Sequence, residues 1–248
     1  MDIRALLFDV NGTLIDIETD EGLEEIYRAI GHFLTYQGIS LRRWQVRDLF
    51  FELMQQQRQT NAESYAEWDA VALWRELLQR KATDYTRSLP PEKLEQLPLF
   101  LAELHRGIAR KRLRLYPQVQ EVLDQLRPHY RMAVVSDAQS AYAVPELHAV
   151  GLLNYFSSVI VSGDYGYRKP DARLFQKALD ALEVQPAEAL FIGNDMYRDI
   201  FGAQQAGLKA IFCSSNQGEK YYLGVHPDYV IYRFAELPEA VKFFETHP

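Results

Sequence analysis

A carboxylate between a short apolar run and a glycine is the strongest chemical signal in the sequence. Asp9 opens the stretch Asp9-Val10-Asn11-Gly12-Thr13 and follows the apolar residues 3–8. A run of this length bounded by a turn signal predicts a buried strand. A carboxylate at the carboxyl end of such a strand points into the crevice where open α/β sheets bind ligands. Asp9 can act there as a nucleophile or a metal ligand; the alternative is a strand-terminating Asp in a tight turn.

A hydroxyl and a second carboxylate follow another predicted strand, residues 132–135. Ser136 at that strand end can hydrogen-bond an anionic oxygen, and Asp137 comes directly after it. Ser is more often used as an N-cap of the following helix, so this alternative stays open.

A lysine precedes a proline and a predicted helix start in the stretch Tyr167-Arg168-Lys169-Pro170-Asp171. Lys169 held in that position can supply fixed positive charge for an anionic transition state. The alternative is a solvated surface lysine. Asp171 is predicted to cap the helix that follows.

Two carboxylates follow the predicted strand 189–192 in the loop Gly193-Asn194-Asp195-Met196-Tyr197-Arg198-Asp199. Mg²⁺ takes oxygen ligands, often from only one or two carboxylates plus water and phosphate. Asp195 or Asp199 could therefore complete a cation site, or both could be turn and N-cap residues.

The elements that must position these residues alternate between strand and helix. Strands are predicted over 132–135, 159–161, 189–192, 210–213 and 229–231, and helices over 140–150, 171–182, 200–206 and 238–245. This alternation predicts βαβ units and a parallel sheet. The four polar stretches then meet at one edge of the sheet, where they form one site for covalent displacement at an anionic centre.

The segment between the first strand and about residue 113 has helical periodicity instead. Gly38 is predicted to end its first helix. Ser64 and Glu67 are expected to form a capping box before a helix that begins near Trp68. The basic run 110–114 is expected to be a solvated hinge face. An all-helical insertion after Asp9 can cover the site as a lid, although a separate helical domain is the alternative.

Composition sets the broad class. The 248 residues are 48% hydrophobic, enough for one large domain or a domain with an insertion. A net charge of −7 argues against a general nucleic-acid or membrane-surface binder. No run is long enough to span a membrane, and no signal peptide is expected. The single cysteine, Cys213, suits a reducing compartment, so a cytoplasmic location is expected.

Taken together, the four polar stretches and the signals Ile200-Phe201-Gly202-Ala203 and Ala206-Gly207 resemble the haloacid dehalogenase-like hydrolase superfamily. The resemblance implies a Rossmann-like core (residues 1–18 and 114–248) with an all-helical cap (19–113). It also implies Mg²⁺, a phospho-aspartyl intermediate on Asp9 and a small phosphorylated metabolite as substrate. By this resemblance, Asn11 lends its backbone carbonyl to the metal, while Ser136 and Lys169 hold the phosphoryl oxygens. The predicted residues are Asp9, Asn11, Ser136 and Lys169 for catalysis, Asp9, Asn11, Gly12, Ser136, Asp137 and Lys169 for phosphate, and Asp9, Asn11, Asp195 and Asp199 for metal.

Two residues depart from the family pattern. Asn11 stands where phosphatases of the family usually carry a second Asp, which protonates the leaving alkoxide and then activates water. Loss of such general acid–base help costs on the order of 10²–10⁴ in rate, so a phosphatase with Asn11 is expected to be slow. Asn194 stands where many relatives have an acid directly after the glycine.

The sequence leaves three functions open. The first is a Mg²⁺-dependent phosphatase. The second is a metal-independent 2-haloacid dehalogenase, which needs no acid at Asn11 because halide leaves without a proton, and in which Arg42 or Arg43 could bind the substrate carboxylate. The third is a non-catalytic binding protein with the same fold.

Overall fold

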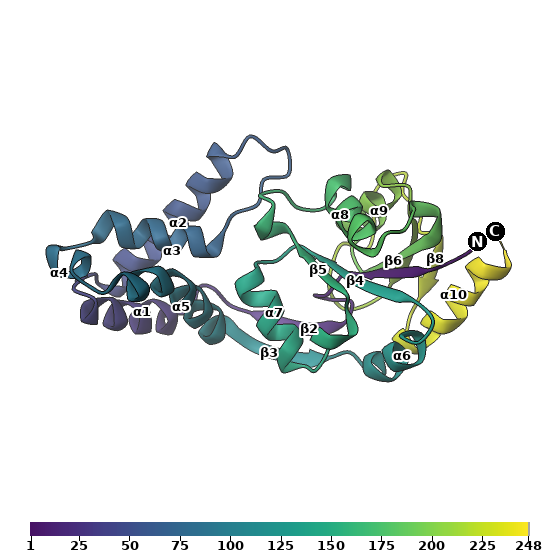
Figure 1. The fold of residues 1–248 in the computed structure, drawn as a ribbon, viewed down its shortest axis with the longest axis horizontal. Coiled ribbons are helices and arrows are strands. Elements are labelled where there is room, and N and C mark those ends of the chain that lie inside the picture. The colour runs from purple at the N-terminus through teal and green to yellow at the C-terminus, as the bar shows by residue number, and fades with distance from the viewer. Residues whose placement is uncertain (248) are drawn as a thin grey trace.

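The protein consists of an α/β core and a bundle of helices joined by a two-stranded ribbon. The structure, a computed structural model, describes residues 1–247. Figure 1 shows the bundle at one end, the core at the other, and the ribbon between them. We call helices α1–α5 the helical unit.

The core is built on a six-stranded parallel sheet, as predicted. The strands are β1 (Ala5–Phe8), β4 (Arg131–Ser136), β5 (Ser158–Val161), β6 (Ala189–Gly193), β7 (Lys209–Cys213) and β8 (Tyr229–Ile231). Their order is β5-β4-β1-β6-β7-β8. In the register, Phe8 of β1 is paired with Val134 of β4 and with Ile192 of β6. The carboxyl ends of these three strands therefore meet at one edge.

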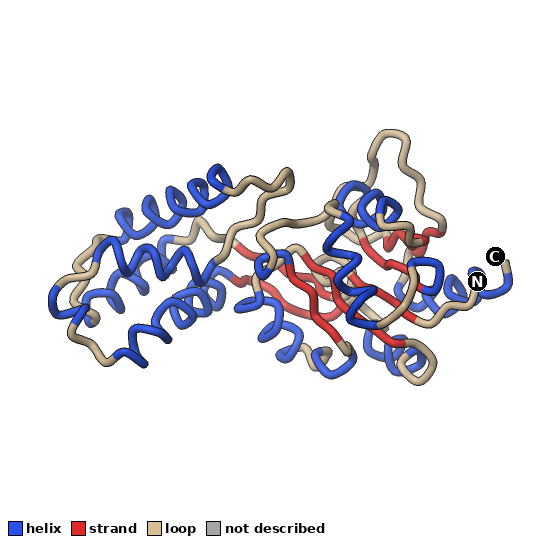
Figure 2. The backbone as a smooth tube through the Cα atoms, turned by 45° about the horizontal axis from the view of Figure 1, so that its top comes forward, coloured by secondary structure: helices blue, strands red, loops and turns tan. Residues whose placement is uncertain are grey.

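Both faces of the sheet are buried, which explains the continuous apolar runs of its strands. On β1, Leu6 packs into the hydrophobic cluster on one face and Leu7 into the cluster on the other. Strand geometry requires this alternation. Figure 2 shows the helices around the strands of the core. The core helices are α6 (Val119–Leu126), α7 (Ser140–Ala149), α8 (Ala172–Leu182), α9 (Gly202–Gln205) and α10 (Leu237–Thr246).

Among the predicted helices of the core, one begins well before its predicted start. Asp171 caps α8 as expected, by accepting a hydrogen bond from the Arg173 backbone N–H at 3.0 Å. The helix predicted over 200–206 instead begins earlier, with a π-helical stretch at Met196–Phe201 that continues into α9. The reason is Asp195, whose carboxylate caps this stretch.

The helical unit has its own hydrophobic core, formed by α1 (Glu24–Tyr36), α2 (Arg43–Thr60), α3 (Ala70–Lys81), α4 (Asp84–Arg87) and α5 (Pro91–Ala109). Phe50 lies at its centre, stacked on His105 at 4.4 Å between ring centroids and tilted against Trp74 at 5.3 Å. Burial lowers the pKa of His105 to about 4, so its ring packs there as a neutral group. After α1, Gly38 adopts φ +82°, in agreement with its predicted role in ending the first helix.

The predicted capping box at Ser64 and Glu67 is wrong. Helix α3 begins at Ala70 and is capped by Asp69, which accepts from the Ala72 N–H at 2.9 Å. The Glu67 carboxylate is turned toward the core instead, where it accepts a hydrogen bond from the Ser162 hydroxyl at 2.9 Å. Glu67 is therefore bonded to Ser162, which is distant in the chain, and not to the backbone of Ser64 as predicted.

The basic run 110–114, expected to be a hinge face, forms a strand. Strand β3 (Arg110–Leu115) pairs antiparallel with β2 (Ile15–Thr19), and the expected unit boundaries fall within this ribbon. The Asp16 carboxylate forms ion pairs with the guanidinium groups of Arg112 at 3.0 Å and Arg114 at 2.8 Å. The Lys111 ammonium is paired with the Asp20 carboxylate at 2.6 Å. Cross-strand ion pairs thus account for the charge pattern.

The helical unit is also fastened to the core beside the site edge. The segment between α2 and α3 lies against the loop after β5, where the Glu67 N–H donates to Gly166 O at 2.9 Å. The Gln139 amide donates to Trp68 O at 2.6 Å and accepts from the Ala70 N–H at 2.9 Å. These backbone contacts fix the approach of the unit to the sheet edge.

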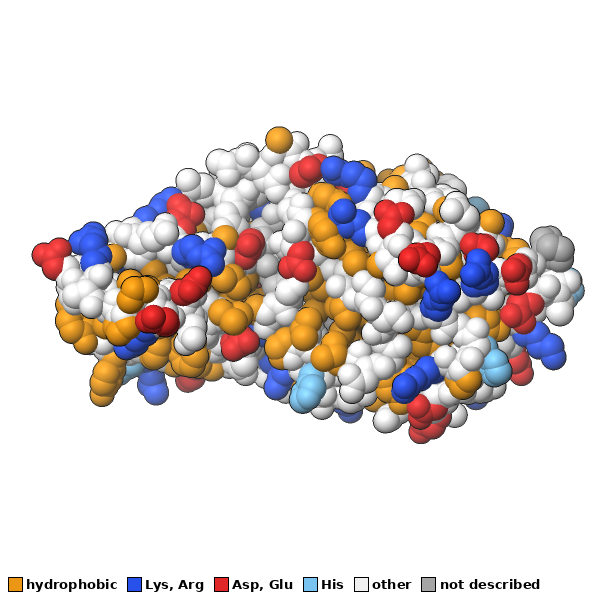
Figure 3. All heavy atoms as spheres, viewed as in Figure 1, with side chains coloured by type: hydrophobic (Ala, Val, Ile, Leu, Met, Phe, Trp, Pro, Cys, Tyr) orange, Lys and Arg blue, Asp and Glu red, His pale blue; other side chains and the backbone are white. Residues whose placement is uncertain are grey.

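On the visible face, acidic and basic side chains are interspersed without a large patch of one sign (Figure 3). Among the helices of residues 1–247, none has the length and apolarity needed to cross a membrane.

Replacement of Phe50 by Ala tests the packing at the centre of the helical unit. Phe50 is fully buried, so we expect Phe50→Ala to lower the free energy of unfolding by about 3–5 kcal/mol. Urea denaturation is the measurement. Phe100→Ala is the matched control because Phe100 is 44% exposed, and it should cost much less. Equal losses in both variants would contradict this packing.

Candidate active site

The carboxyl ends of β1, β4 and β6 open into a cavity of about 220 Å³. It is lined by Asp9, Asn11, Ser136, Asp137, Lys169, Asn194, Arg198, Asp199, Gln217 and Gly218. Every strand-end stretch singled out in the sequence contributes to this lining. Of the predicted site residues, Gly12 and Asp195 do not line it.

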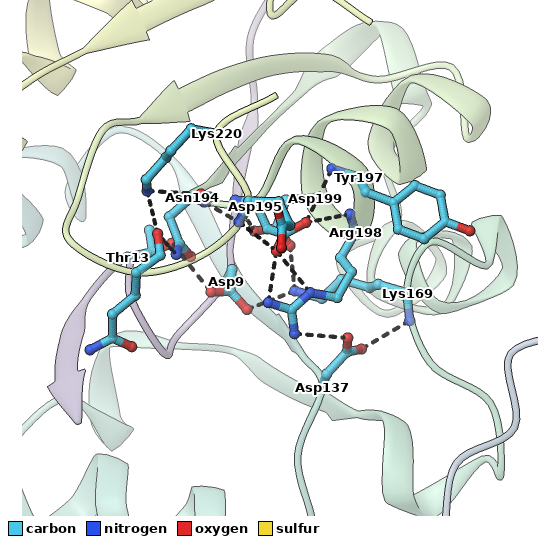
Figure 4. A network of polar contacts seen from close by, with 12 residues as sticks. Asp9, Thr13, Asp137, Lys169, Asn194, Asp195, Tyr197, Arg198, Asp199 and Lys220 are labelled. Atoms are coloured by element: carbon cyan, nitrogen blue, oxygen red, sulfur yellow. Dashed lines mark hydrogen bonds and ion pairs between the residues drawn. The ribbon is translucent and has the colours of Figure 1, made fainter. Parts of the chain in front are cut away.

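Lys169 lies at the centre of the polar network (Figure 4). Its ammonium donates to Asp9 Oδ1 and to Asp199 Oδ1, both at 2.6 Å, and to the Val135 backbone oxygen at 3.1 Å. The side chain is only 2% exposed. All three ammonium hydrogens therefore have partners, and the alternative of a surface lysine is wrong.

Electrostatics keeps Lys169 charged despite its burial. Burial by itself lowers the pKa of Lys169, but the Asp199 and Asp9 carboxylates outweigh it and raise the pKa above its ordinary value. For Asp199 burial acts in the other direction and raises the pKa of the carboxyl group, although the Lys169 ammonium opposes this rise. One fixed cation thus compensates two buried carboxylates.

A threonine from the first motif holds Asp9 from the other side. The Thr13 hydroxyl lies 3.2 Å from Asp9 Oδ2 and 3.0 Å from Asn194 Oδ1. Gly12 makes this approach possible, because its φ is +92° and an added Cβ would overlap the Asn194 side chain. The Gly12 N–H donates to Ile15 O at 2.9 Å, so it serves the turn.

Asp195 is committed to the backbone and to Arg198. Its Oδ1 accepts from the Tyr197 N–H at 3.1 Å and the Arg198 N–H at 2.8 Å. Its Oδ2 accepts from the Glu219 N–H at 3.1 Å and from the Arg198 guanidinium at 2.8 Å. Burial works to raise the pKa of Asp195, but the Arg198 bonds lower it overall. Asp195 is therefore a turn and N-cap residue, which is the alternative that the sequence left open.

Three buried oxygen atoms of the cavity lining lack a hydrogen-bond partner within residues 1–247: Asn11 Oδ1, Ser136 Oγ and Asp137 Oδ2. Buried polar atoms are normally satisfied, so three orphans in one cavity mark a place for a polar ligand or for water. Ser136 is therefore better explained by the ligand-binding hypothesis than by capping, since its side chain caps no helix.

The residues do not fit the predicted Mg²⁺ ligand set. Asp199 Oδ2 accepts from the Asn194 and Asp195 N–H groups, both at 3.0 Å, and its Oδ1 holds Lys169. Both oxygens of Asp195 likewise accept hydrogen bonds, as described above. No group of three or more His, Cys, Asp or Glu residues in the described part of the chain could hold a metal ion. Asp9 is thus left without a second free carboxylate to share a cation.

Sequence reasoning missed Asn194, Arg198, Gln217 and Gly218 as site residues and gave Thr13 no role. Gln217 and Gly218 lie in the polar loop after β7, so the rule that strand ends carry ligand-binding residues could have found them. Arg198 lies in the stretch after β6 that was singled out for its carboxylates, but only the fold and the Asp195 carboxylate direct its side chain to the cavity.

Replacement of Lys169 tests the shared cation. In Lys169→Met the two buried carboxylates lose their counter-charge, so we expect unfolding to become easier by about 3–5 kcal/mol at pH 8. Burial raises the pKa of Asp199, and a buried carboxylate with a raised pKa lowers the stability of the folded protein as pH rises, so the deficit should shrink at pH 5. Urea denaturation at both pH values measures it.

Adding Asp199→Asn to Lys169→Met should recover part of the loss, because one of the facing charges is gone. Lys242→Met, on the exposed face of α10, is the control. A pH-independent deficit would rule out the shared charge as its cause.

Comparisons with known proteins agree with this architecture. A family model described as haloacid dehalogenase-like hydrolase matches residues 3–207. The phosphoserine phosphatase of Thermus thermophilus is 32% identical over 149 residues, which are 58% of this chain and 57% of that protein. The match thus spans little more than half of that relative.

Two further matches span nearly whole chains. The pyrophosphatase PpaX of Halalkalibacterium halodurans is 25% identical over 97% of this chain and 98% of that protein. The crystal structure of a 2-haloacid dehalogenase from Pseudomonas syringae superimposes with a TM-score of 0.70 at 24% identity, over 97% of this chain and 98% of that one, which shows the fold. Because the family model covers most of the sequence, the chain belongs to the haloacid dehalogenase-like hydrolases.

Proposed function

We propose that the protein is a phosphatase of small phosphorylated metabolites in which Asp9 is the nucleophile. The observation that carries the proposal is the placement of Asp9 in a polar cavity beside a charged lysine and an unpartnered serine hydroxyl. The phosphatase names of the sequence relatives support it. Nucleophilic catalysis needs such an activated, oriented carboxylate.

Each predicted phosphate-binding group would meet a different part of the substrate. The Ser136 hydroxyl has a free hydrogen to donate to a phosphoryl oxygen. Lys169 and Arg198 bring positive charge to the cavity where negative charge develops. Asn11 can position the substrate through its amide, but an amide transfers no proton at neutral pH.

The reaction then proceeds in two displacements. An Asp9 oxygen attacks phosphorus and the bond from phosphorus to the alkoxide breaks, which leaves an aspartyl phosphate. Water attacks the same phosphorus next, the bond to Asp9 breaks, and inorganic phosphate leaves. Splitting one difficult step into two easier ones is the benefit of the covalent path.

A second depression adjoins the cavity and offers room for the organic part of a substrate. Its volume is about 490 Å³, and it shares Lys169, Arg198 and Gly218 with the Asp9 cavity. Tyr65 reaches it from the helical unit and Arg168 from the core. A small metabolite could place its phosphoryl group at Asp9 and its remainder here.

The 2-haloacid dehalogenase is the second candidate, favoured by Asn11, since halide release needs no acid. The arginines expected to bind the carboxylate do not support it. Arg42 and Arg43 line a depression on the helical unit together with Arg28 and His32, and neither lines the Asp9 cavity.

Asp9→Asn tests the nucleophile, and the product that the wild type releases separates the two candidate functions. We expect phosphate release from a panel of phosphorylated metabolites to fall by roughly 10³-fold or more, because an amide oxygen is a poor nucleophile. Asp180→Asn, on the exposed face of α8, should keep wild-type turnover. Release of chloride from 2-chloropropionate, with no phosphate release from any ester, would instead establish the dehalogenase.

Removal of magnesium tests whether Asp195 and Asp199 are unavailable as Mg²⁺ ligands. Because both oxygens of Asp195 and both oxygens of Asp199 already accept hydrogen bonds, we expect chelation by EDTA to change the rate less than about tenfold. Calorimetry with Mg²⁺ on the same protein provides a readout independent of turnover. Tight Mg²⁺ binding together with a strict Mg²⁺ requirement would show that the loop rearranges to free a carboxylate.

A further inference from the structure

We propose that Asp137 is the proton-transfer group of this site and takes over the task for which Asn11 lacks a carboxyl group. It would protonate the leaving alkoxide in the first displacement and accept a proton from water in the second. This inference rests on the proposed phosphatase function.

The position of Asp137 in the cavity suits this role. Asp137 follows Ser136 at the carboxyl end of β4 and lines the same cavity as Asp9 and Asn11. Its Oδ1 accepts a hydrogen bond from the Lys169 backbone N–H at 2.9 Å, which fixes the orientation of the carboxyl group. Its Oδ2 is buried and has no hydrogen-bond partner within residues 1–247. One oxygen is therefore anchored, and the other is left for a ligand.

The other carboxylates around the cavity are already engaged. Asp9 is held beside Lys169 as the nucleophile. Asp195 and Asp199 each have both oxygens bonded to backbone N–H groups or to a cation. Of the acidic residues that line the cavity, Asp137 alone has an oxygen without a donor.

Electrostatics supports the assignment. Burial raises the pKa of Asp137 to about 6, against the lowering influence of the Lys169 ammonium and the Arg198 guanidinium, while the Asp199 carboxylate adds to the rise. Arg198 Nη1 lies 3.8 Å from Asp137 Oδ2, and the Asp137 side chain is 10% exposed. A group whose pKa lies near the working pH is an efficient acid and base.

The proton balance closes over the two displacements. When the bond from phosphorus to the alkoxide breaks, the proton of the Asp137 carboxyl group moves to the alkoxide oxygen, and an alcohol leaves. Asp137 is then a carboxylate. When water attacks the aspartyl phosphate, Asp137 takes one of its protons as phosphorus–oxygen bond formation releases Asp9. The enzyme returns to its initial protonation state, and one water has been consumed.

Asp137→Asn is the test variant, since an amide oxygen can still accept from the Lys169 N–H but cannot transfer a proton. We expect kcat/KM for alkyl phosphates to fall by about 10²-fold or more, within the usual range for general acid catalysis. For aryl phosphates, whose leaving groups need little acid, the fall should stay below tenfold. A merely structural role would reduce both alike.

The pH profile gives an independent readout. Because the acid form of Asp137 is required in the first displacement, wild-type kcat/KM for alkyl phosphates should decline above about pH 6. This decline should be absent in Asp137→Asn and present in Asp137→Glu, which keeps a carboxyl group. Thermal unfolding of each variant confirms folding.

Rescue completes the experiment. Asn11→Asp in the Asp137→Asn background should restore alkyl phosphate hydrolysis at least tenfold, because it returns a carboxyl group to the cavity. Equal losses for alkyl and aryl esters, with an unchanged pH profile, would overturn the role of Asp137 and leave the phosphatase intact. A wild type that hydrolyses neither ester would overturn the proposed function itself.

Discussion

The ammonium of Lys169 is the interaction on which the site depends. It joins the end of β1 through Asp9, the end of β4 through Val135 O and the loop after β6 through Asp199. Two carboxylates this deeply buried could not remain charged side by side without it, since each isolated charge carries a large desolvation cost. The same cation fixes the carboxylate of Asp9, the nucleophile of the proposed reaction, so the stability of this edge and the proposed chemistry share one residue.

The loop after β6 shows how hydrogen bonding decides the use of a carboxylate. In sequence, Asp195 and Asp199 are equally suited to bind a cation. In the fold, Asp199 closes the loop on its own backbone and holds Lys169, while Asp195 caps the helical turn and holds Arg198. Positive charge at the cavity therefore comes from Lys169 and Arg198, and Asp137 is the lining carboxylate that keeps an oxygen without a hydrogen-bond donor.

The helical unit is positioned by buried polar contacts as well as by its ribbon. Gln139, one residue before α7, bonds to the backbone at Trp68 and Ala70, and Glu67 reaches Ser162 after β5. On the other side, Arg106 of α5 is paired with the buried Glu146 of α7 at 2.7 Å. These contacts connect the unit to α7 and to the segments that follow β4 and β5, on one side of β1, so the position of the unit is tied to this half of the sheet.

The sequence by itself determined the parallel core, the helical insertion, the placement of Asp9 and Ser136 at strand ends, and the placement of Lys169 shortly before a helix. These follow from signals local to the chain: apolar runs of strand length, helical periodicity, and a glycine or proline directly after a polar residue. The prediction of Asp171 as a cap succeeded for the same reason, because the partner of a cap is two residues away.

Only the tertiary structure decided which partner each polar group takes. The fold brings Asn194 to Thr13, turns Glu67 away from its predicted cap, pairs the basic run of β3 with Asp16, and leaves one oxygen of Asp137 free. Each outcome depends on groups far apart in the chain, and a hydrogen bond or ion pair requires its atoms within a few ångströms. Residue type limits what a side chain can do, but packing decides which groups are close enough for it to act on.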